Sequence, residues 1–370
     1  MSGAALGERP AAALRPALPT YRLDRSFEWN AENGPRFEGP FPPVPDTPEK
    51  RFLGLPVRSR FGLAASLGLR APWVELYARL GFDILTYKTV RLRPKLAAPM
   101  PNWLFVPDDA RAADPEAPLR AEAAIPADPA AATAVGSIAM PSSDPAVWRP
   151  DIARCRALLR PGQVLVVSVV GTAREGMGED AFVAEFEELA AAVREAGAQA
   201  VEANLSCPNV GRGEGETYLN APLAGRIARA VRRGAGGLPV LLKIGAGADD
   251  AALAALLRAV AGSADAVTAV NAPSRVILDA SGAPAFGTGR ERAGLMGGAV
   301  HGIALDCVRR AVDIVRRDRL GLEIVAVGGV TSPARARAML EAGACAALAA
   351  SGAAWNPYLA MEVKRADPAL

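Results

Sequence analysis

A short apolar strand and the polar loop after it are encoded by Val201-Glu202-Ala203-Asn204-Leu205-Ser206-Cys207-Pro208-Asn209-Val210. The apolar run 198–205 is typical of a buried strand. Pro208 and the glycine-rich segment 211–215 interrupt it, so Cys207 is expected on a loop. A buried strand that ends in polar residues is one unit of a parallel α/β architecture.

Short apolar runs alternate with amphipathic, Ala-rich segments from about residue 61 onward. This alternation predicts a parallel sheet, and its length predicts a closed (β/α)8 TIM barrel within the 370 residues. The expected strands are 61–66, 82–87, 133–139, 163–170, 198–205, 239–244, 265–271, 322–327 and 345–350. The expected helices are 72–80, 145–159, 179–196, 220–233, 249–261, 299–317 and 332–342.

Nine strands are one too many for the barrel, and we expect 133–139 to lie outside it. The Pro/Ala/Asp-rich segment 94–130 before it is interpreted as an insertion that shapes a lid or an interface. Residues 1–50 are interpreted as a Pro/Ala-rich extension lying on the barrel domain, 51–370. Its aromatic residues give it something to bury.

Composition excludes several other classes of protein. The 42 basic and 39 acidic residues are interspersed without basic runs, which gives no electrostatic case for nucleic acid. No apolar run approaches the ~20 residues of a membrane span. The four cysteines have no metal-ligand spacing, so no metal is expected, and a reducing cytoplasmic setting fits them best.

Polar residues follow the expected strands where a barrel places its chemistry. Asn204, Ser206, Cys207 and Asn209 combine amides, a hydroxyl and a thiol, which suits a neutral ring with alternating N–H and C=O groups. A purely structural role for these residues is the alternative, because Asn and Pro commonly end strands and a lone Cys is often a small buried hydrophobic residue.

Two lysines and a further asparagine occupy equivalent strand ends. Lys88 follows the second run, Lys243 lies inside an apolar strand, and Asn271 ends another. A lysine in a buried strand is costly unless it is paired, so Lys243 is the position least compatible with a purely structural role. It also allows a lyase or aldolase with a Schiff base at Lys243.

Glycines mark the last two strand ends. Gly328-Gly329 precedes a helix opening at Ser332-Pro333, and Ser351-Gly352 follows the final strand. In a barrel, the loops after strands seven and eight often bind phosphate, through backbone N–H groups and a helix N-terminus. The two glycine segments are therefore expected to form a phosphate-binding site.

The motif Asn204-Leu205-Ser206-Cys207-Pro208-Asn209 resembles the signature of the dihydroorotate dehydrogenase family, in its soluble branch with Cys as the base. A related motif occurs in the pyrimidine-reducing domain of dihydropyrimidine dehydrogenase. The resemblance covers roughly residues 55–360, including Tyr87-Lys88-Thr89-Val90 and the segment 294–299.

The resemblance implies FMN as cofactor and assigns roles to individual residues. Catalysis would involve Cys207, Lys243 and Lys88. The substrate would contact Asn204, Ser206, Asn209 and Asn271. The flavin would contact Ala64, Ala65, Lys88, Thr89, Asn204, Lys243, Asn271, Gly297, Gly298, Gly328, Gly329, Ser351 and Gly352.

Two residues depart from the family pattern. Ala139 stands where the family carries an asparagine that holds the pyrimidine, so an altered substrate is open. Ala353 stands where a Thr hydroxyl commonly contacts the phosphate. Loss of one neutral hydrogen bond costs ~1 kcal/mol, which weakens binding without abolishing catalysis.

The implied reaction interconverts a C–C single and double bond in dihydroorotate or a related small cyclic amide. Cys207 thiolate would take a proton, and hydride would pass to flavin N5. Rivals are a dihydropyrimidine-dehydrogenase-like or specialised-metabolism oxidoreductase, the Lys243 lyase or aldolase, and a degenerate barrel without activity. No GxGxxG motif identifies the electron acceptor, and a homodimer is the family-like expectation.

Overall fold

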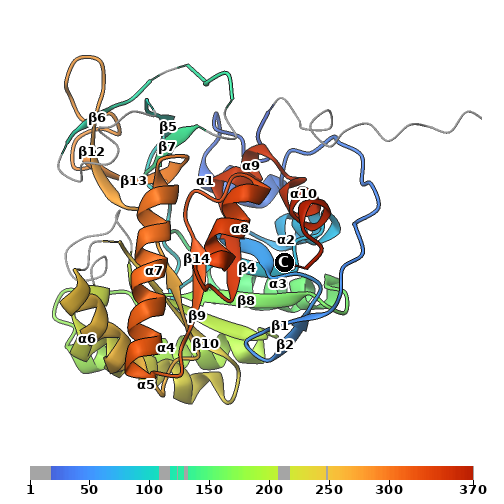
Figure 1. Cartoon of the computed structure of the whole chain (residues 1–370). Coiled ribbons are helices and arrows are strands. Elements are labelled where there is room, and N and C mark those ends of the chain that lie inside the picture. Colours follow the sequence, from blue (N-terminus) through green and yellow to red (C-terminus); the bar gives the residue numbers. More distant parts are fainter. Residues whose placement is uncertain are drawn as a thin grey trace, which may run out of the picture.

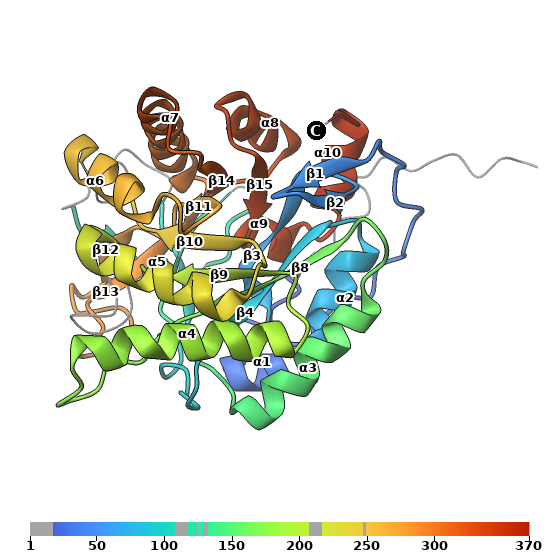
Figure 2. The same cartoon turned by 90° about the horizontal axis from the view of Figure 1, so that it is seen from below.

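The computed structural model describes residues 18–107, 117–122, 124–128, 132–206, 217–246 and 249–369. Its centre is a closed barrel of parallel strands, as predicted (Figures 1 and 2). Going round the barrel, the strands are β10 (Val240–Ile244), β11 (Ala266–Ala269), β14 (Glu323–Val327), β15 (Ala346–Ala349), β3 (Phe61–Gly68), β4 (Ile84–Val90), β8 (Val164–Val169) and β9 (Ala200–Asn204).

The expected helices cover the outside of the barrel, with ends within two residues of the predictions. They are α2 (Ala71–Arg79), α3 (Pro145–Leu158), α4 (Glu179–Glu195), α5 (Ala221–Ala235), α6 (Asp250–Val260), α7 (Val300–Asp318) and α8 (Pro333–Glu341). In α5 the start and stop signals are local, because Asn220 caps the first turn and Gly236 adopts a left-handed conformation after the last.

A second sheet extends the carboxyl end of the barrel. Its strands, in spatial order, are β5 (Trp103–Phe105), β7 (Thr133–Gly136), β13 (Arg292–Gly297), β12 (Ser274–Leu278) and β6 (Leu119–Arg120). They belong to the connections β4–α3 and β11–α7, and both connections leave the carboxyl ends of barrel strands. The predicted strand 133–139 therefore lies outside the barrel, and the sequence missed its two partners, β5 and β13.

Arg290 ties the two connections together. Its guanidinium donates to the carbonyl oxygens of Pro99 at 2.6 Å, Pro101 at 2.9 Å and Ser137 at 3.0 Å. A guanidinium has five N–H donors in a fixed fork, so one side chain can satisfy several backbone acceptors. The second sheet is thus fixed to the insertion that follows β4.

The described part of the N-terminal segment packs on the barrel. Ser26 caps the short helix α1 (Phe27–Asn33), and Phe27 on that helix is buried. Trp73 Nε1 donates to the Asn30 carbonyl at 3.0 Å, and Thr20 N donates to the Ala354 carbonyl at 2.8 Å. These bonds join the segment to α2 and to the end of the chain.

The opposite, amino end of the barrel is closed by a small hairpin of β1 (Lys50–Phe52) and β2 (Leu55–Val57). Phe52 and Val57 are fully buried, in one apolar cluster with Ile84 and Val164 from the barrel interior. Large side chains that fill this end leave the carboxyl end for function, as in other barrels of this type.

Three short helical elements complete the described chain: the 3-10 turn η3 (Thr217–Leu219), α9 (Ser351–Trp355) and α10 (Leu359–Ala366). On α10, the Lys364 ammonium lies 2.7 Å from the Asp83 carboxylate at the start of β4, and each side chain is 3% exposed. Ser59 Oγ donates to the same carboxylate at 2.6 Å. This buried ion pair anchors the C-terminal helix to the barrel.

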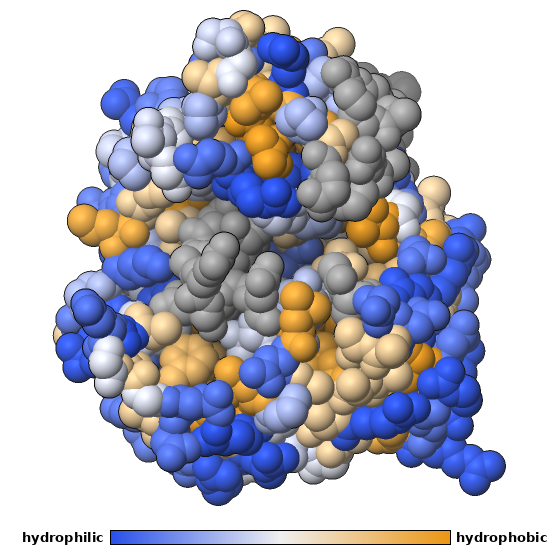
Figure 3. Space-filling model, turned by 90° about the vertical axis from the view of Figure 1, so that its left-hand side faces the viewer, coloured by the Kyte–Doolittle hydropathy of each residue, from blue (hydrophilic) through white to orange (hydrophobic). Residues whose placement is uncertain are grey.

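The surface seen in Figure 3 is mostly hydrophilic, with small separate groups of hydrophobic residues. Among the described residues, Leu96 is the most exposed large hydrophobe, at 78%. No helix in the described ranges is long and apolar enough to cross a membrane.

We expect Lys364→Met to lower the free energy of unfolding by about 3–5 kcal/mol, because it leaves the Asp83 carboxylate buried without its counter-charge. Denaturant unfolding measures the change. The double variant Asp83→Asn/Lys364→Met should recover part of the loss, since no unpaired charge then remains. A single variant as stable as the parent protein would contradict the anchoring role.

Candidate functional site

The barrel interior changes from apolar to polar toward the carboxyl ends of five strands. Alternate residues of a strand face the same side. The interior apolar cluster includes one residue from each of β8 to β11, namely Val166, Ala200, Leu241 and Ala266. Two residues further along each of these strands, the next inward position is polar. With the equivalent position on β4, these positions are Thr86, Ser168, Glu202, Lys243 and Thr268, which are all at most 6% exposed.

Several of these buried polar atoms have no hydrogen-bond partner among the described residues. They include Thr86 Oγ1, Glu202 Oε1 and Thr268 Oγ1, together with Ser206 Oγ just after β9. Leaving a buried polar group unpaired costs about 1–3 kcal/mol, so such groups are usually satisfied by protein, water or ligand. The carboxyl end of the barrel is therefore prepared for a polar ligand.

Strand register brings together three of the predicted residues. Lys243 on β10 is directly opposite Asn204 on β9 and Thr268 on β11. Asn271 follows β11, and its Nδ2 donates to the Ser206 carbonyl and, at 3.4 Å, to Asn204 Oδ1. Lys243 has no side-chain hydrogen bond or ion pair among the described residues. A buried ammonium thus lies beside two asparagines at the barrel mouth.

The rest of the signature motif cannot be placed in the same way. Cys207 and Asn209 lie outside the described residues. Ser206 is buried, and its N–H donates to Asn204 Oδ1 at 3.1 Å. Ser206 is therefore held directly beside Asn204.

A buried arginine and a methionine at this mouth have no counterpart in the predictions. Arg91 is fully buried, and its guanidinium donates to the carbonyls of Met140 and Gly171 and to Thr172 Oγ1, at 2.9–3.2 Å. Met140 and its neighbour Ala139 have positive φ angles of 49° and 68°. Only this three-dimensional pairing distinguishes Arg91 from the many surface arginines in the sequence.

Ala139 leaves the position of the expected pocket asparagine without an amide, and Met140 fills the space beside Asn204. Asn204 Nδ2 donates to Met140 Sδ at 3.4 Å. A thioether is a weak acceptor, so an oxygen acceptor on a ligand can replace it. Asn204 Oδ1 is already occupied by Ser206 and Asn271.

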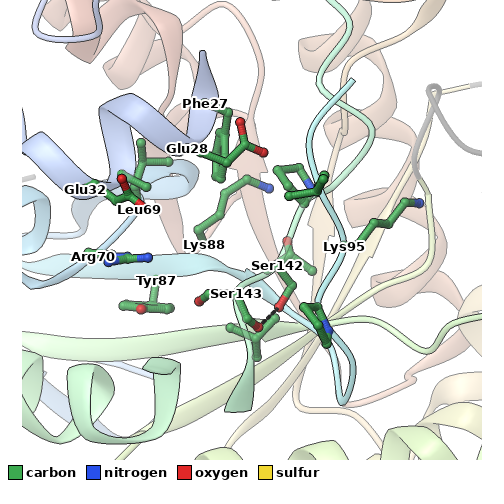
Figure 4. Close-up of a pocket in the computed structure, with 16 residues that line it drawn as sticks. Phe27, Glu28, Glu32, Leu69, Arg70, Tyr87, Lys88, Lys95, Ser142 and Ser143 are labelled. Carbon is green, nitrogen blue, oxygen red and sulfur yellow. Dashed lines mark hydrogen bonds between the residues drawn. The ribbon is translucent and has the colours of Figure 1, made fainter. Parts of the chain in front are cut away.

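Lys88 lies on β4 at the wall of a cavity of about 190 Å³. Figure 4 shows its side chain extending from the strand toward α1, which carries Glu28 and Glu32. Lys95 and Ser142 line another part of the cavity. The cavity therefore has both signs of charge, and α1 closes one side of it.

The remaining predicted flavin contacts on β3 and β4 differ in their surroundings. Ala64 is buried in the interior cluster, and Ala65 beside it is partly exposed. Thr89 is buried, and its Oγ1 pairs with Ser168 Oγ at 3.1 Å.

The predicted glycine loops meet at one place, although they come from three connections. Arg335 Nη1, in the first turn of α8, donates at 3.2 Å to the carbonyls of Gly298 and Gly329 and to Thr331 Oγ1. A Cβ on Gly352 would lie 2.7 Å from the Val330 carbonyl, so only glycine allows this approach of α9 to the loop after β14.

Neighbouring residues complete this region. Gly297 ends β13 with a φ of 83°, and Ser351 and the buried Ala353 lie in α9. His301 is half-buried on α7, and its buried Nδ1 has no hydrogen-bond partner within the described part of the chain. A Cβ on Gly329 would lie 2.5 Å from the His301 backbone nitrogen.

Comparison with known proteins agrees with this geometry. A family model described as dihydroorotate dehydrogenase matches residues 161–366. Dihydroorotate dehydrogenase of Dictyostelium discoideum is 30% identical over 359 residues, which cover 93% of this chain and 96% of that protein. The catalytic subunit of dihydroorotate dehydrogenase B (NAD(+)) from Maridesulfovibrio salexigens is 32% identical over 190 residues, 50% of this chain and 58% of that subunit.

More distant similarity extends to a related enzyme and to solved structures. Subunit PreA of NAD-dependent dihydropyrimidine dehydrogenase from Escherichia coli is 35% identical over 113 residues, 30% of this chain and 25% of that subunit. Ligand-free DHODH from Eimeria tenella shares the fold, with a TM-score of 0.69 at 19% identity over 91% of each chain. The chain therefore belongs to the dihydroorotate dehydrogenase family, whose members are FMN-dependent oxidoreductases acting on CH–CH bonds.

Proposed function

We propose that this protein oxidises L-dihydroorotate, or a closely related cyclic amide, at the carboxyl end of its barrel. The observation that supports this most directly is the buried Lys243 beside Asn204 and Asn271, at a mouth where several polar atoms lack protein partners. When bound, FMN supplies the redox chemistry by accepting a hydride from the substrate.

The donor set fits the isoalloxazine ring of FMN. The ring carries carbonyl oxygens and nitrogens along one edge, and Lys243 would hold that edge with its ammonium. Buried hydroxyls at Thr86 and Thr268 have hydrogen-bonding capacity to spare. An ammonium fixed in a site that excludes water stabilises developing negative charge without reorganising solvent.

The base in this proposal is Cys207. The three described cysteines are poor candidates, because burial raises the thiol pKa of Cys155 and Cys345 and that of Cys307 to about 11. Those thiols stay protonated at neutral pH. An unperturbed thiol has a pKa of about 8.5, so Cys207 would take a proton more readily from the carbon next to a carbonyl.

Lys88 and the asparagines would orient the substrate. Lys88 lies on β4, two strands from Asn204 in the barrel order, and would contact a carboxylate or the flavin. The N–H of Asn204 that now meets Met140 Sδ would donate to a substrate carbonyl instead. Asn209 and Ser206 are further proposed contacts.

A dihydropyrimidine-dehydrogenase-like reaction is the second candidate. One observation favours it. Beside Asn204, at the carboxyl end of the barrel, the segment around Ala139 presents the Met140 thioether instead of a side-chain amide. A substrate ring with no polar group facing Met140 would lose little binding free energy from this replacement of an amide by a thioether. The choice between the two reactions is one of substrate, and both use the same residues.

The setting of the enzyme is also a proposal. The three described cysteines are unpaired, which supports the reducing cytoplasm. A homodimer is proposed from family resemblance, and the proposed electron acceptors are fumarate, oxygen, a quinone or a partner protein.

Anaerobic addition of L-dihydroorotate to the FMN-loaded protein should bleach its visible flavin absorbance. The Cys207→Ala variant should retain the flavin spectrum. Its flavin absorbance should bleach about 10²–10⁴-fold more slowly than that of the parent protein, which is the usual contribution of a general base. Stopped-flow absorbance measures both rates. A parent protein that bleaches only with dihydrouracil would identify the second candidate, and an unaffected Cys207→Ala variant would remove Cys207 from the mechanism.

Lys243→Met should slow flavin reduction by about 10²–10³-fold, as expected for loss of one electrostatic contact to developing charge. Lys243→Arg keeps the charge and should lie between Lys243→Met and the parent. Reduction rates at saturating substrate, normalised to bound FMN, separate this effect from lost cofactor. Equal rates for all three proteins would contradict the assigned role of Lys243.

A further inference from the structure

Arg335 is a half-buried cation that has no carboxylate partner among the described residues. Its Nη1 is occupied by Gly298, Gly329 and Thr331, whereas its Nε and Nη2 have no hydrogen bond there. Most arginines on this protein's helices pair with acids, for example Arg310 with Asp250. An unpaired guanidinium beside glycine loops leaves N–H groups and a positive charge available to an anion.

His301 lies in the same place. Its backbone N–H donates to the Gly298 carbonyl at 3.2 Å, and a side chain on Gly329 would collide with it. Burial and the positive charge of Arg335 lower the pKa of His301, and Arg309 on α7 contributes in the same direction. The imidazole and the guanidinium are thus close enough to sense each other across the loop 328–329.

We propose that Arg335, supported by His301, recognises the phosphate of FMN at the loops of Gly298 and Gly329. The guanidinium would supply the contact that is missing because Ala353 has no hydroxyl. The inference rests on the proposed function only through the identity of the cofactor. It concerns affinity for one end of FMN and is independent of the substrate.

The test compares FMN with riboflavin, which lacks the phosphate, by quenching of flavin fluorescence during titration of the apoprotein. Arg335→Gln should weaken FMN binding about 10-fold or more, the loss expected for a hydrogen bond to a charged group. The affinity of the Arg335→Gln variant for riboflavin should change less than about 2-fold, which is much less than the expected loss of FMN affinity. Arg335→Lys keeps the charge and should restore part of the FMN affinity.

Arg337 provides a matched control on the same helix. It pairs with Asp367 and donates to the Ala366 carbonyl, on the side of α10. Arg337→Gln should leave both affinities unchanged. Equal losses of FMN and riboflavin affinity in Arg335→Gln would show that Arg335 only braces the loops, and would overturn the proposal.

The parent protein allows a second test that requires no folded variant. His301 is the only histidine in the chain, so its NMR signal reports a single site. Without FMN the pKa of His301 should lie below the ordinary value of a histidine, and FMN should raise this pKa because a dianion nearby favours the imidazolium. Riboflavin should not raise it. The same His301 pKa with and without FMN would place the phosphate elsewhere and overturn the proposal.

Discussion

Burial of polar side chains in one half of a barrel interior is the constraint on which the rest of the structure depends. Lys243, Glu202 and Thr268 occupy positions where an apolar core would pack at lower cost. The amino end compensates, because Phe52 and Val57 seal it with apolar contacts. The barrel interior is therefore apolar at its amino end and carries unsatisfied polar groups toward its carboxyl end, where a cofactor can pair with them.

Positions around this mouth are held from outside the barrel. Arg91 joins the end of β4 to Met140 and to the loop after β8, and Arg290 joins the two long connections to each other. Both arginines donate mainly to backbone carbonyls, so they fix the course of the chain rather than the identity of neighbouring side chains. Such bracing helps to stabilise a loop in which Ala139 and Met140 adopt the left-handed conformation.

The barrel and its helices were predictable because each unit carries its own local signals. Apolar runs, caps such as Asn220 and stops such as Gly236 lie within a few residues of the elements they define. The second sheet was not predictable in full, since β7 pairs with β13 across more than a hundred residues. The strand-end positions of Lys243, Asn204 and Asn271 were enough to predict them as candidate site residues, and the structure brings the three together. Arg91, Met140 and Arg335 could not, because their importance comes from partners distant in sequence.

The hydrogen-bond directions at the mouth limit what the two described asparagines can offer a substrate. Asn204 Oδ1 accepts from Ser206 and Asn271, and Asn271 Oδ1 accepts from Ala272. Both amide oxygens are therefore engaged within the protein, and the donor that Asn204 gives to a weak sulfur acceptor is the more easily released. A carbonyl-rich ring matches such a mouth better than a ring that presents mainly N–H groups. Any acceptor for ring N–H groups must therefore come from other residues. Because Ala139 supplies no amide, the side of the ring that faces Ala139 is where we expect the substrate of this protein to differ from that of its relatives.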